Sequence, residues 1–142
     1  MRPRPMQFRP IDVFFYGLFM DAESLEAKGF HPVNGRQACV AGMALHVGLR
    51  ATLVPDPGKC AHGFVFGLTH VEIDRLYAEP SVAAYRPEAV IAQLADQSCI
   101  AALCFNLPPS DEIVETNSDY AEKLRAVAGR LGLPADYVAS IR

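Results

Sequence analysis

The sequence lacks an excess of positive charge, a long hydrophobic run and the common nucleotide-binding motifs. Its formal net charge is −3, whereas nucleic-acid-binding domains are normally basic. No run of about 18 apolar residues is present, so we expect no transmembrane helix. The patterns G-x-x-x-x-G-K with Ser or Thr, G-x-G-x-x-G and G-x-S-x-G are also missing, which leaves two kinds of phosphate cradle and the nucleophile elbow without support. We therefore expect neither a nucleic acid nor a membrane as partner.

Cysteine is too sparse and too scattered to indicate a disulfide framework or a metal centre. None of the four cysteines forms a C-x-x-C pair. Cys39, Cys99 and Cys104 lie in apolar strand-like runs, where a reduced cysteine behaves as a small core hydrophobe. The segment Cys60-Ala61-His62 offers two potential ligands, which is too few for a zinc site. We therefore expect free thiols and no metal site.

The composition fits one globular domain preceded by a short tail. A chain of 142 residues with 51% hydrophobic residues is long enough to bury one core. Residues 1–10 hold three arginines among three prolines, and proline blocks helix and strand pairing. We interpret them as a flexible tail and residues 11–142 as the domain. Asp12 interrupts the apolar segment 11–20, and no convincing cleavage site follows, which favours a cytoplasmic location over secretion.

Apolar periodicity predicts more strands than helices. Helix caps are expected at Asp21, at Thr69 with Glu72 in capping-box spacing, and at Asn117 or Ser118. The strands do not alternate regularly with helices, which argues against a doubly wound sheet. We therefore predict an α+β fold in which about five to six strands form a small mixed β-barrel or a curled sheet, flanked by a few helices. The expected strands are 13–16, 37–47, 49–54, 63–67, 85–94 and 98–106, and the expected helices are 21–28, 70–77, 118–131 and 134–141.

Glycine and proline mark the expected breaks in these elements. Gly42 predicts a bend or bulge inside strand 37–47. Pro55-Asp56-Pro57-Gly58 predicts a turn between two strands. Residues 107–116 contain two further prolines and are expected to form a loop.

Glu79 and the segment Tyr16-Gly17 are the candidate site residues. Glu79 stands between a predicted helix and a predicted strand, after Leu76 and Tyr77, and Gly17 ends the apolar run 13–16. A carboxylate beside apolar elements and a glycine turn after a strand are the parts of an acid/base site with an anion cradle. The same residues also fit a solvated loop carboxylate and an ordinary strand end, and Tyr77 fits the core better than a site.

Four stretches, in matching order, resemble the γ-glutamylcyclotransferase superfamily, which includes the avirulence-induced-gene-like proteins. The likeness covers about residues 13–141. The family's turn commonly reads Tyr-Gly-Ser-Asn, and Leu18 and Phe19 stand here in place of Ser and Asn, which makes that wall of the pocket more apolar. Tyr77 replaces the family's aspartate, and Pro80 replaces its glycine. The stretches are Phe14-Phe15-Tyr16-Gly17, Gly63-Phe64-Val65-Phe66-Gly67-Leu68-Thr69, residues 73–85, and Tyr120 with Gly132-Leu133-Pro134-x-x-Tyr137.

The resemblance implies an enzyme of the acyltransferase or lyase type that cyclises a γ-glutamyl amine or a related compound. In this family the substrate's α-amine attacks its own γ-carbonyl, which gives 5-oxoproline and the free amine, as in glutathione metabolism, with no metal or organic cofactor. Glu79 is implied as the general acid/base, and main-chain N–H groups of the Gly17 turn are implied as donors to the oxyanion and the α-carboxylate. The implied substrate-binding residues are Tyr16, Gly17, Leu18, Phe19, Tyr85 and Tyr120.

Two other interpretations stay open. Leu18, Phe19 and Pro80 favour a catalytically inactive small-molecule-binding member of the same fold. The C-terminal helices would also suit a structural or oligomerisation domain. A Glu79 carboxylate directed into a cavity, toward the N–H groups of the Gly17 turn, favours the enzyme, whereas a carboxylate that faces bulk solvent favours the structural domain.

Overall fold

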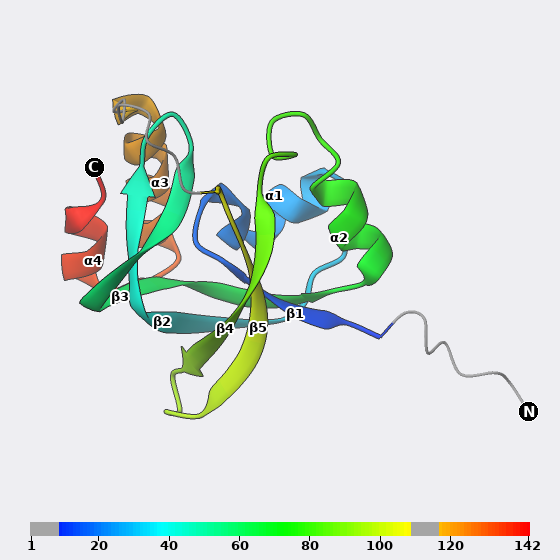
Figure 1. Ribbon diagram of the computed structural model, residues 1–142, viewed down its shortest axis with the longest axis horizontal. Coiled ribbons are helices and arrows are strands. Elements are labelled where there is room, and N and C mark those ends of the chain that lie inside the picture. The colour runs from blue at the N-terminus through cyan, green and yellow to red at the C-terminus, as the bar shows by residue number, and fades with distance from the viewer. Residues whose placement is uncertain (1–8, 109–116) are drawn as a thin grey trace, which may run out of the picture.

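Five strands close into a mixed β-barrel around the hydrophobic core, in the order β1-β3-β2-β4-β5 (Figure 1). The computed structural model describes residues 9–108 and 117–142. All neighbouring strands are antiparallel except β1 and β5, which run parallel and close the barrel. The predicted α+β fold with a small mixed barrel is confirmed. The strands are β1 (Ile11–Phe15), β2 (Val33–Val47), β3 (Ala51–Leu68), β4 (Arg86–Leu94) and β5 (Cys99–Asn106).

The predicted turn at residues 55–58 is wrong as a boundary between strands, because β3 continues through it. Ala41 pairs with Cys60 while Met43 pairs with Pro55, so the intervening residues of β3 lie opposite Gly42 alone. Gly42 and Gly58 have positive φ angles of +81° and +90°, which glycine adopts without steric cost. Residues 56–59 thus form a large bulge within one strand, and the bulge predicted at Gly42 is confirmed.

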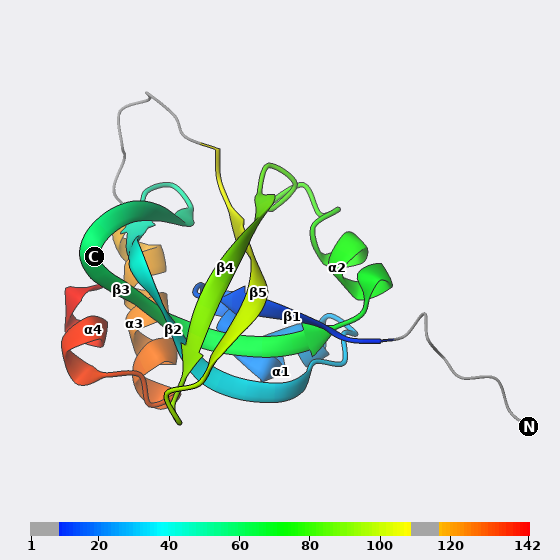
Figure 2. The same cartoon turned by 60° about the horizontal axis from the view of Figure 1, so that its bottom comes forward.

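The helices lie outside the barrel, with α3 and α4 on one side and α2 on the other (Figures 1 and 2). Asp21 accepts a hydrogen bond from the Glu23 N–H, and Thr69 and Glu72 form a complete capping box. Asn117 caps α3 by accepting from the Tyr120 N–H, which decides between the two predicted caps. The helices are α1 (Ala22–Ala27), α2 (His70–Leu76), α3 (Ser118–Arg130) and α4 (Ala135–Ser140), and a 3-10 turn, η2 (Leu18–Met20), follows β1.

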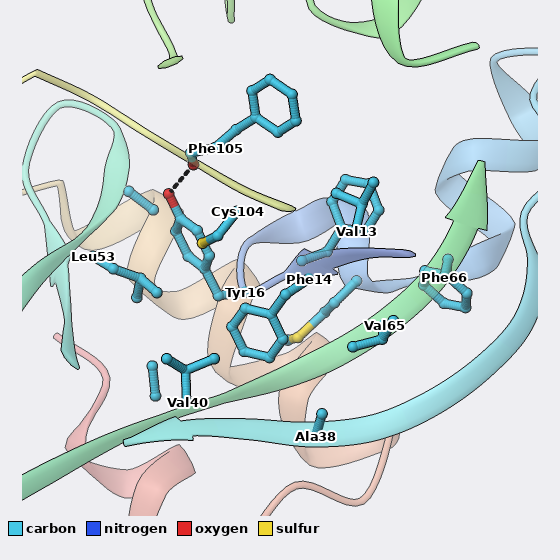
Figure 3. Packing of buried hydrophobic residues seen from close by; sticks show 14 of the residues in the cluster. Val13, Phe14, Tyr16, Ala38, Val40, Leu53, Val65, Phe66, Cys104 and Phe105 are labelled. Carbon is cyan, nitrogen blue, oxygen red and sulfur yellow. Dashed lines mark hydrogen bonds between the residues drawn. The ribbon is translucent and has the colours of Figure 1, made fainter. Parts of the chain in front are cut away.

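The barrel interior is filled by apolar side chains from every strand, several of which point toward one another in Figure 3. Cys104 is fully buried among them, as the apolar run predicted, but Cys99 is exposed and Cys39 is only half-buried. The core prediction for those two thiols is wrong because side chains alternate between the two faces of a strand, and their pairing partner Gln93 faces outward with them. All four thiols are free.

Two predicted segments fall largely outside the described residues. These are the N-terminal tail, residues 1–10, and the loop at residues 107–116. Among the residues that the structure does describe, no helix is long and apolar enough to span a membrane.

Candidate functional site

A largely apolar cavity of about 260 Å³ lies at the end of β1. The predicted substrate-binding residues Tyr16, Gly17, Leu18, Phe19, Tyr85 and Tyr120 all line it, although they come from three separate parts of the chain. Three of the four resembling stretches therefore meet around one space, and Glu79 is the single predicted site residue that does not line it. The other lining residues are Phe14, Phe15, Arg50, Ala51, Tyr77, Ser81, Val82 and Phe105.

Gly17 is favoured by a close approach rather than by an unusual backbone angle. Its φ of −103° is accessible to any residue, but a Cβ at this position would lie 2.8 Å from the Tyr120 hydroxyl. The Met20 N–H donates to the Gly17 carbonyl at 3.0 Å and closes the turn. Among the described residues, neither the Leu18 nor the Phe19 N–H donates to another backbone group, so this segment presents main-chain donors next to the cavity.

Two tyrosine hydroxyls of the cavity tie strand ends together. The Tyr16 hydroxyl donates to the Phe105 carbonyl at 2.7 Å (Figure 3), and the Tyr85 hydroxyl donates to the Ala51 carbonyl. Burial raises the pKa of Tyr16 far above its ordinary value and raises the pKa of Tyr85 to about 12. Both side chains therefore remain neutral near neutral pH and hold the walls of the cavity in place.

Tyr120 differs from these two, because its hydroxyl faces the Gly17 turn. Burial raises the pKa of the Tyr120 hydroxyl, and a backbone hydrogen bond with Leu18 partly offsets that rise. The Tyr120 hydroxyl and the Leu18 N–H thus form one polar point on an otherwise apolar wall.

Eight lining residues are not among the predicted site residues, and Tyr77 and Arg50 are two of them. The sequence favours the core for Tyr77, and Tyr77 does stack on Phe105 with ring centroids 3.8 Å apart, but it also lines the cavity. Arg50 follows the Gly48-Leu49 turn and carries no motif that would have identified it. Its Nη1 donates to the carbonyl of Ser81, another lining residue, at 3.3 Å.

The Glu79 carboxylate lies outside the cavity and pairs with Lys28. The Lys28 Nζ is 3.2 Å from each carboxylate oxygen, and the Glu79 side chain is 37% exposed. The Glu79 carbonyl accepts from the Val82 N–H at 3.0 Å, and Val82 lines the cavity. Lys28 also lies 5.9 Å from the ring centroid of Phe19, a lining residue, so Glu79 occupies the edge of the site with its side chain turned toward α1.

The sequence matches the family model described as γ-glutamyl cyclotransferase, AIG2-like, over residues 13–123. No curated protein matches the chain at a significant level. Over the described part of the chain, no group of three or more His, Cys, Asp or Glu side chains is arranged to hold a metal ion.

Several solved structures share the fold. A γ-glutamyl cyclotransferase superposes with a TM-score of 0.78 at 17% identity, covering 94% of this chain and 88% of the other. A human protein described as uncharacterized gives 0.76 at 17% identity, with the same two coverages of 94% and 88%. A yeast γ-glutamyl cyclotransferase described as specific to glutathione gives 0.63 at 13% identity and covers 94% of each chain. At these identities the likeness establishes a common fold.

Proposed function

Because the chain belongs to the γ-glutamyl cyclotransferase, AIG2-like family, we propose that it cyclises a γ-glutamyl amine or a related compound to 5-oxoproline and releases the amine. The observation that carries this proposal is the shared cavity, in which the segment Tyr16 to Phe19 meets Tyr85 and Tyr120, with Glu79 at its edge. In the reaction, the α-amine forms a bond to the γ-carbonyl carbon of the same molecule. The bond from that carbon to the amine portion then breaks, and no water is consumed.

Glu79 is proposed as the group that moves the proton. The substrate's α-amine is mostly protonated at neutral pH and must lose a proton before it attacks, and the leaving nitrogen must gain one. A carboxylate within reach of both nitrogens performs both transfers. Lys28 supplies the cation beside Glu79, and the substrate's α-ammonium carries the same charge and can take its place.

The main-chain donors of the Gly17 turn are proposed to stabilise the tetrahedral intermediate. That intermediate places a negative charge on the former carbonyl oxygen, and preorganised N–H groups in an apolar site stabilise such a charge strongly. The Phe19 N–H borders the cavity without a backbone acceptor among the described residues, and the Leu18 N–H borders it in a hydrogen bond with the Tyr120 hydroxyl that the intermediate would share or replace. Holding the amine over the carbonyl adds a proximity effect, which is worth about 7–11 kcal/mol of the barrier in well-oriented systems.

The apolar wall made by Leu18 and Phe19 has a consequence for the chemistry. Both side chains line the cavity beside the turn, where the family commonly has Ser and Asn. An apolar wall keeps water away from the reacting carbonyl, and hydrogen bonds to that carbonyl are stronger where water is excluded. We therefore expect cyclisation to dominate over hydrolysis.

The proposed function is tested by incubating the protein with a panel of γ-glutamyl amines and measuring 5-oxoproline. The panel contains a γ-glutamyl amino acid, glutathione and a γ-glutamyl alkylamine, so that the released amine varies while the cyclising half stays constant. We expect 5-oxoproline from at least one member, and none from an otherwise identical α-N-acetylated compound, whose nitrogen cannot attack. The absence of 5-oxoproline from every member would overturn the proposal.

A second candidate function is ligand binding without turnover. Two observations favour it: the Glu79 carboxylate pairs with Lys28 instead of lining the cavity, and the turn carries Leu18 and Phe19. Binding of 5-oxoproline or of γ-glutamyl amines without any turnover would support this alternative.

A further inference from the structure

We infer that Arg50 recognises the α-carboxylate of the ligand, so that the cavity selects compounds in which an amine and a carboxylate share one carbon atom. This inference rests on the proposed function, because a γ-glutamyl compound carries both groups on its α-carbon. It also assigns two groups of the ligand to different donors. Arg50 takes the α-carboxylate, and the Gly17 turn is left for the oxygen of the reacting carbonyl, through the Phe19 N–H and through the Leu18 N–H that now bonds to the Tyr120 hydroxyl.

Arg50 is the one charged side chain among the described residues that line the cavity. The remaining walls are apolar or aromatic, apart from tyrosine hydroxyls and Ser81. In such surroundings a charge interacts over a lower effective dielectric than it does in water. A ligand with a carboxylate therefore gains more from Arg50 than it would from an arginine on an open surface.

The backbone that carries Arg50 is anchored on two sides. The Gly48 N–H donates to the Arg50 carbonyl at 3.2 Å, which closes the turn between β2 and β3. The Asn117 Nδ2 donates to the Leu49 carbonyl at 3.2 Å, and the same Asn117 caps the helix that carries Tyr120. Arg50 and Tyr120 are thus held by one side chain at neighbouring points of the cavity.

The Arg50 guanidinium uses one of its five N–H donors in a hydrogen bond to the described residues. Its one hydrogen bond to the described residues is the contact of 3.3 Å with the Ser81 carbonyl, and none of the three ion pairs among those residues includes it. Arginine presents five N–H donors in a planar fork that fits a carboxylate with two parallel bonds. A ligand carboxylate therefore replaces one long contact with an uncharged carbonyl by a pair of hydrogen bonds between opposite charges.

Arg50 and Glu79 reach the cavity edge through the same segment. The Arg50 guanidinium contacts the Ser81 carbonyl, and Ser81 stands two residues after Glu79. An amino acid carries its ammonium and its carboxylate on the same α-carbon, so a cation that lines the cavity and an anion at the edge of that cavity fit the two groups. The arrangement matches a zwitterion and leaves the rest of the ligand to the aromatic side of the cavity.

The inference is tested by calorimetric titration with two lactams of the same ring. 5-oxoproline carries the carboxylate, and 2-pyrrolidinone lacks it. We expect wild type to bind 5-oxoproline about 10- to 100-fold more tightly than 2-pyrrolidinone, which corresponds to a charge-assisted hydrogen-bonded pair. Arg50→Gln is expected to abolish that preference while leaving the affinity for 2-pyrrolidinone unchanged. Arg50→Lys is expected to retain part of it, because lysine keeps the charge without the fork.

Arg86→Gln is the matched control. Arg86 also donates from Nη1 to a backbone carbonyl of the same segment, that of Ala83 at 3.4 Å, but it does not line the cavity. We expect it to keep the wild-type preference. A wild type without preference, an Arg50→Gln variant that keeps the preference, or an equal loss of affinity for both lactams would overturn the inference.

The test of Arg50 and the test of the proposed reaction can fail independently. A carboxylate preference that depends on Arg50, together with no turnover of any γ-glutamyl amine, would remove the reaction and retain the role of Arg50. Turnover together with an Arg50→Gln variant that keeps its preference would retain the reaction and remove that role.

Discussion

The Lys28 ammonium lies 3.2 Å from both carboxylate oxygens of Glu79 and so joins the end of α1 to the turn after α2. The two side chains are 39% and 37% exposed. Ion pairs in such a solvated setting contribute only about 0–1 kcal/mol. The pair therefore fixes a position for Glu79 at the edge of the cavity without holding it there strongly, and a ligand cation can displace Lys28 at little cost.

Replacing Glu79 by glutamine is the first prediction. The amide cannot accept and return a proton, so we expect Glu79→Gln to abolish formation of 5-oxoproline while the melting temperature stays nearly unchanged, since only a weak ion pair is lost. Product formation and thermal unfolding are measured on the same preparation. Glu26→Gln, at an exposed position of α1, is the control and should keep full activity. Turnover by Glu79→Gln at the wild-type rate would remove Glu79 from the mechanism.

Replacing Lys28 by methionine tests whether Lys28 competes with the substrate's ammonium for Glu79 or takes part in the reaction. If the substrate's ammonium displaces Lys28, Lys28→Met should lower KM by about 2- to 5-fold, which is the range that an exposed ion pair allows, and leave kcat unchanged. The difference from wild type should shrink in high salt, because salt screens the competing pair. Lys123→Met, at an exposed position of α3, serves as the control. A fall in kcat to the level of Glu79→Gln would instead make Lys28 part of the chemistry.

The sequence predicts those parts of the fold and site that depend on local pattern. The cap at Asp21, the capping box at Thr69 and the bulge at Gly42 follow from residue type and spacing, and all three are present. The convergence of Gly17, Tyr85 and Tyr120 on one cavity was reached through the family resemblance, because no local rule brings distant segments together.

Other features were set by tertiary contacts that the sequence does not display. Pro55-Asp56-Pro57-Gly58 has the composition of a turn, yet the long pairing of β2 with β3 absorbs it as a bulge. The place of Arg50 in the cavity follows from the barrel bringing the β2–β3 turn opposite Ser81. The Lys28 partner of Glu79 comes from an element 51 residues away, and exposed charges of this kind carry no sequence pattern.

Adding a methyl group at Gly17 should disturb the cavity through Tyr120. The new Cβ would lie 2.8 Å from the Tyr120 hydroxyl, so the ring must shift, and we expect Gly17→Ala to lose about 1 kcal/mol of stability and to weaken ligand binding. Tyr120→Phe removes the clashing oxygen, so the double variant should recover part of the loss, with a coupling energy of about 1 kcal/mol. Denaturant unfolding of the four proteins measures it. Simple additivity of the two single effects would contradict the contact.

Alkaline pH should destabilise the protein through its buried tyrosines. Burial raises the pKa of Tyr85 to about 12, whereas an unfolded tyrosine titrates near pH 10. Below about pH 10 both states hold the proton and stability is unaffected. Between about pH 10 and 12 the unfolded chain releases a proton that the folded protein keeps, so stability falls as pH rises.

Urea unfolding at several pH values measures that slope. Tyr85→Phe should reduce the difference in bound protons between the two states by up to about one, and it should also be less stable at neutral pH because it loses the hydrogen bond to Ala51. Equal slopes for wild type and Tyr85→Phe across this window would contradict the assignment.

The close approach of backbone to Gly63 gives the sharpest stability prediction. A Cβ on Gly63 would lie 2.1 Å from the Phe15 carbonyl oxygen, in the ladder that joins β1 to β3. A carbonyl in a paired strand cannot rotate away as a flexible side chain can, so Gly63→Ala should separate the two strands and cost about 3 kcal/mol or more. Gly129→Ala is the matched control, because a Cβ there meets no heavy atom of the described residues within 4 Å outside its chain neighbours and the backbone of α3 itself, and alanine there should stabilise by about 0.5–1 kcal/mol. Denaturant unfolding compares the two variants. Similar changes in the free energy of unfolding from both variants would mean that β1 and β3 do not pack as closely as described. The segment Tyr16-Gly17, which follows β1, would then have no fixed position beside the cavity.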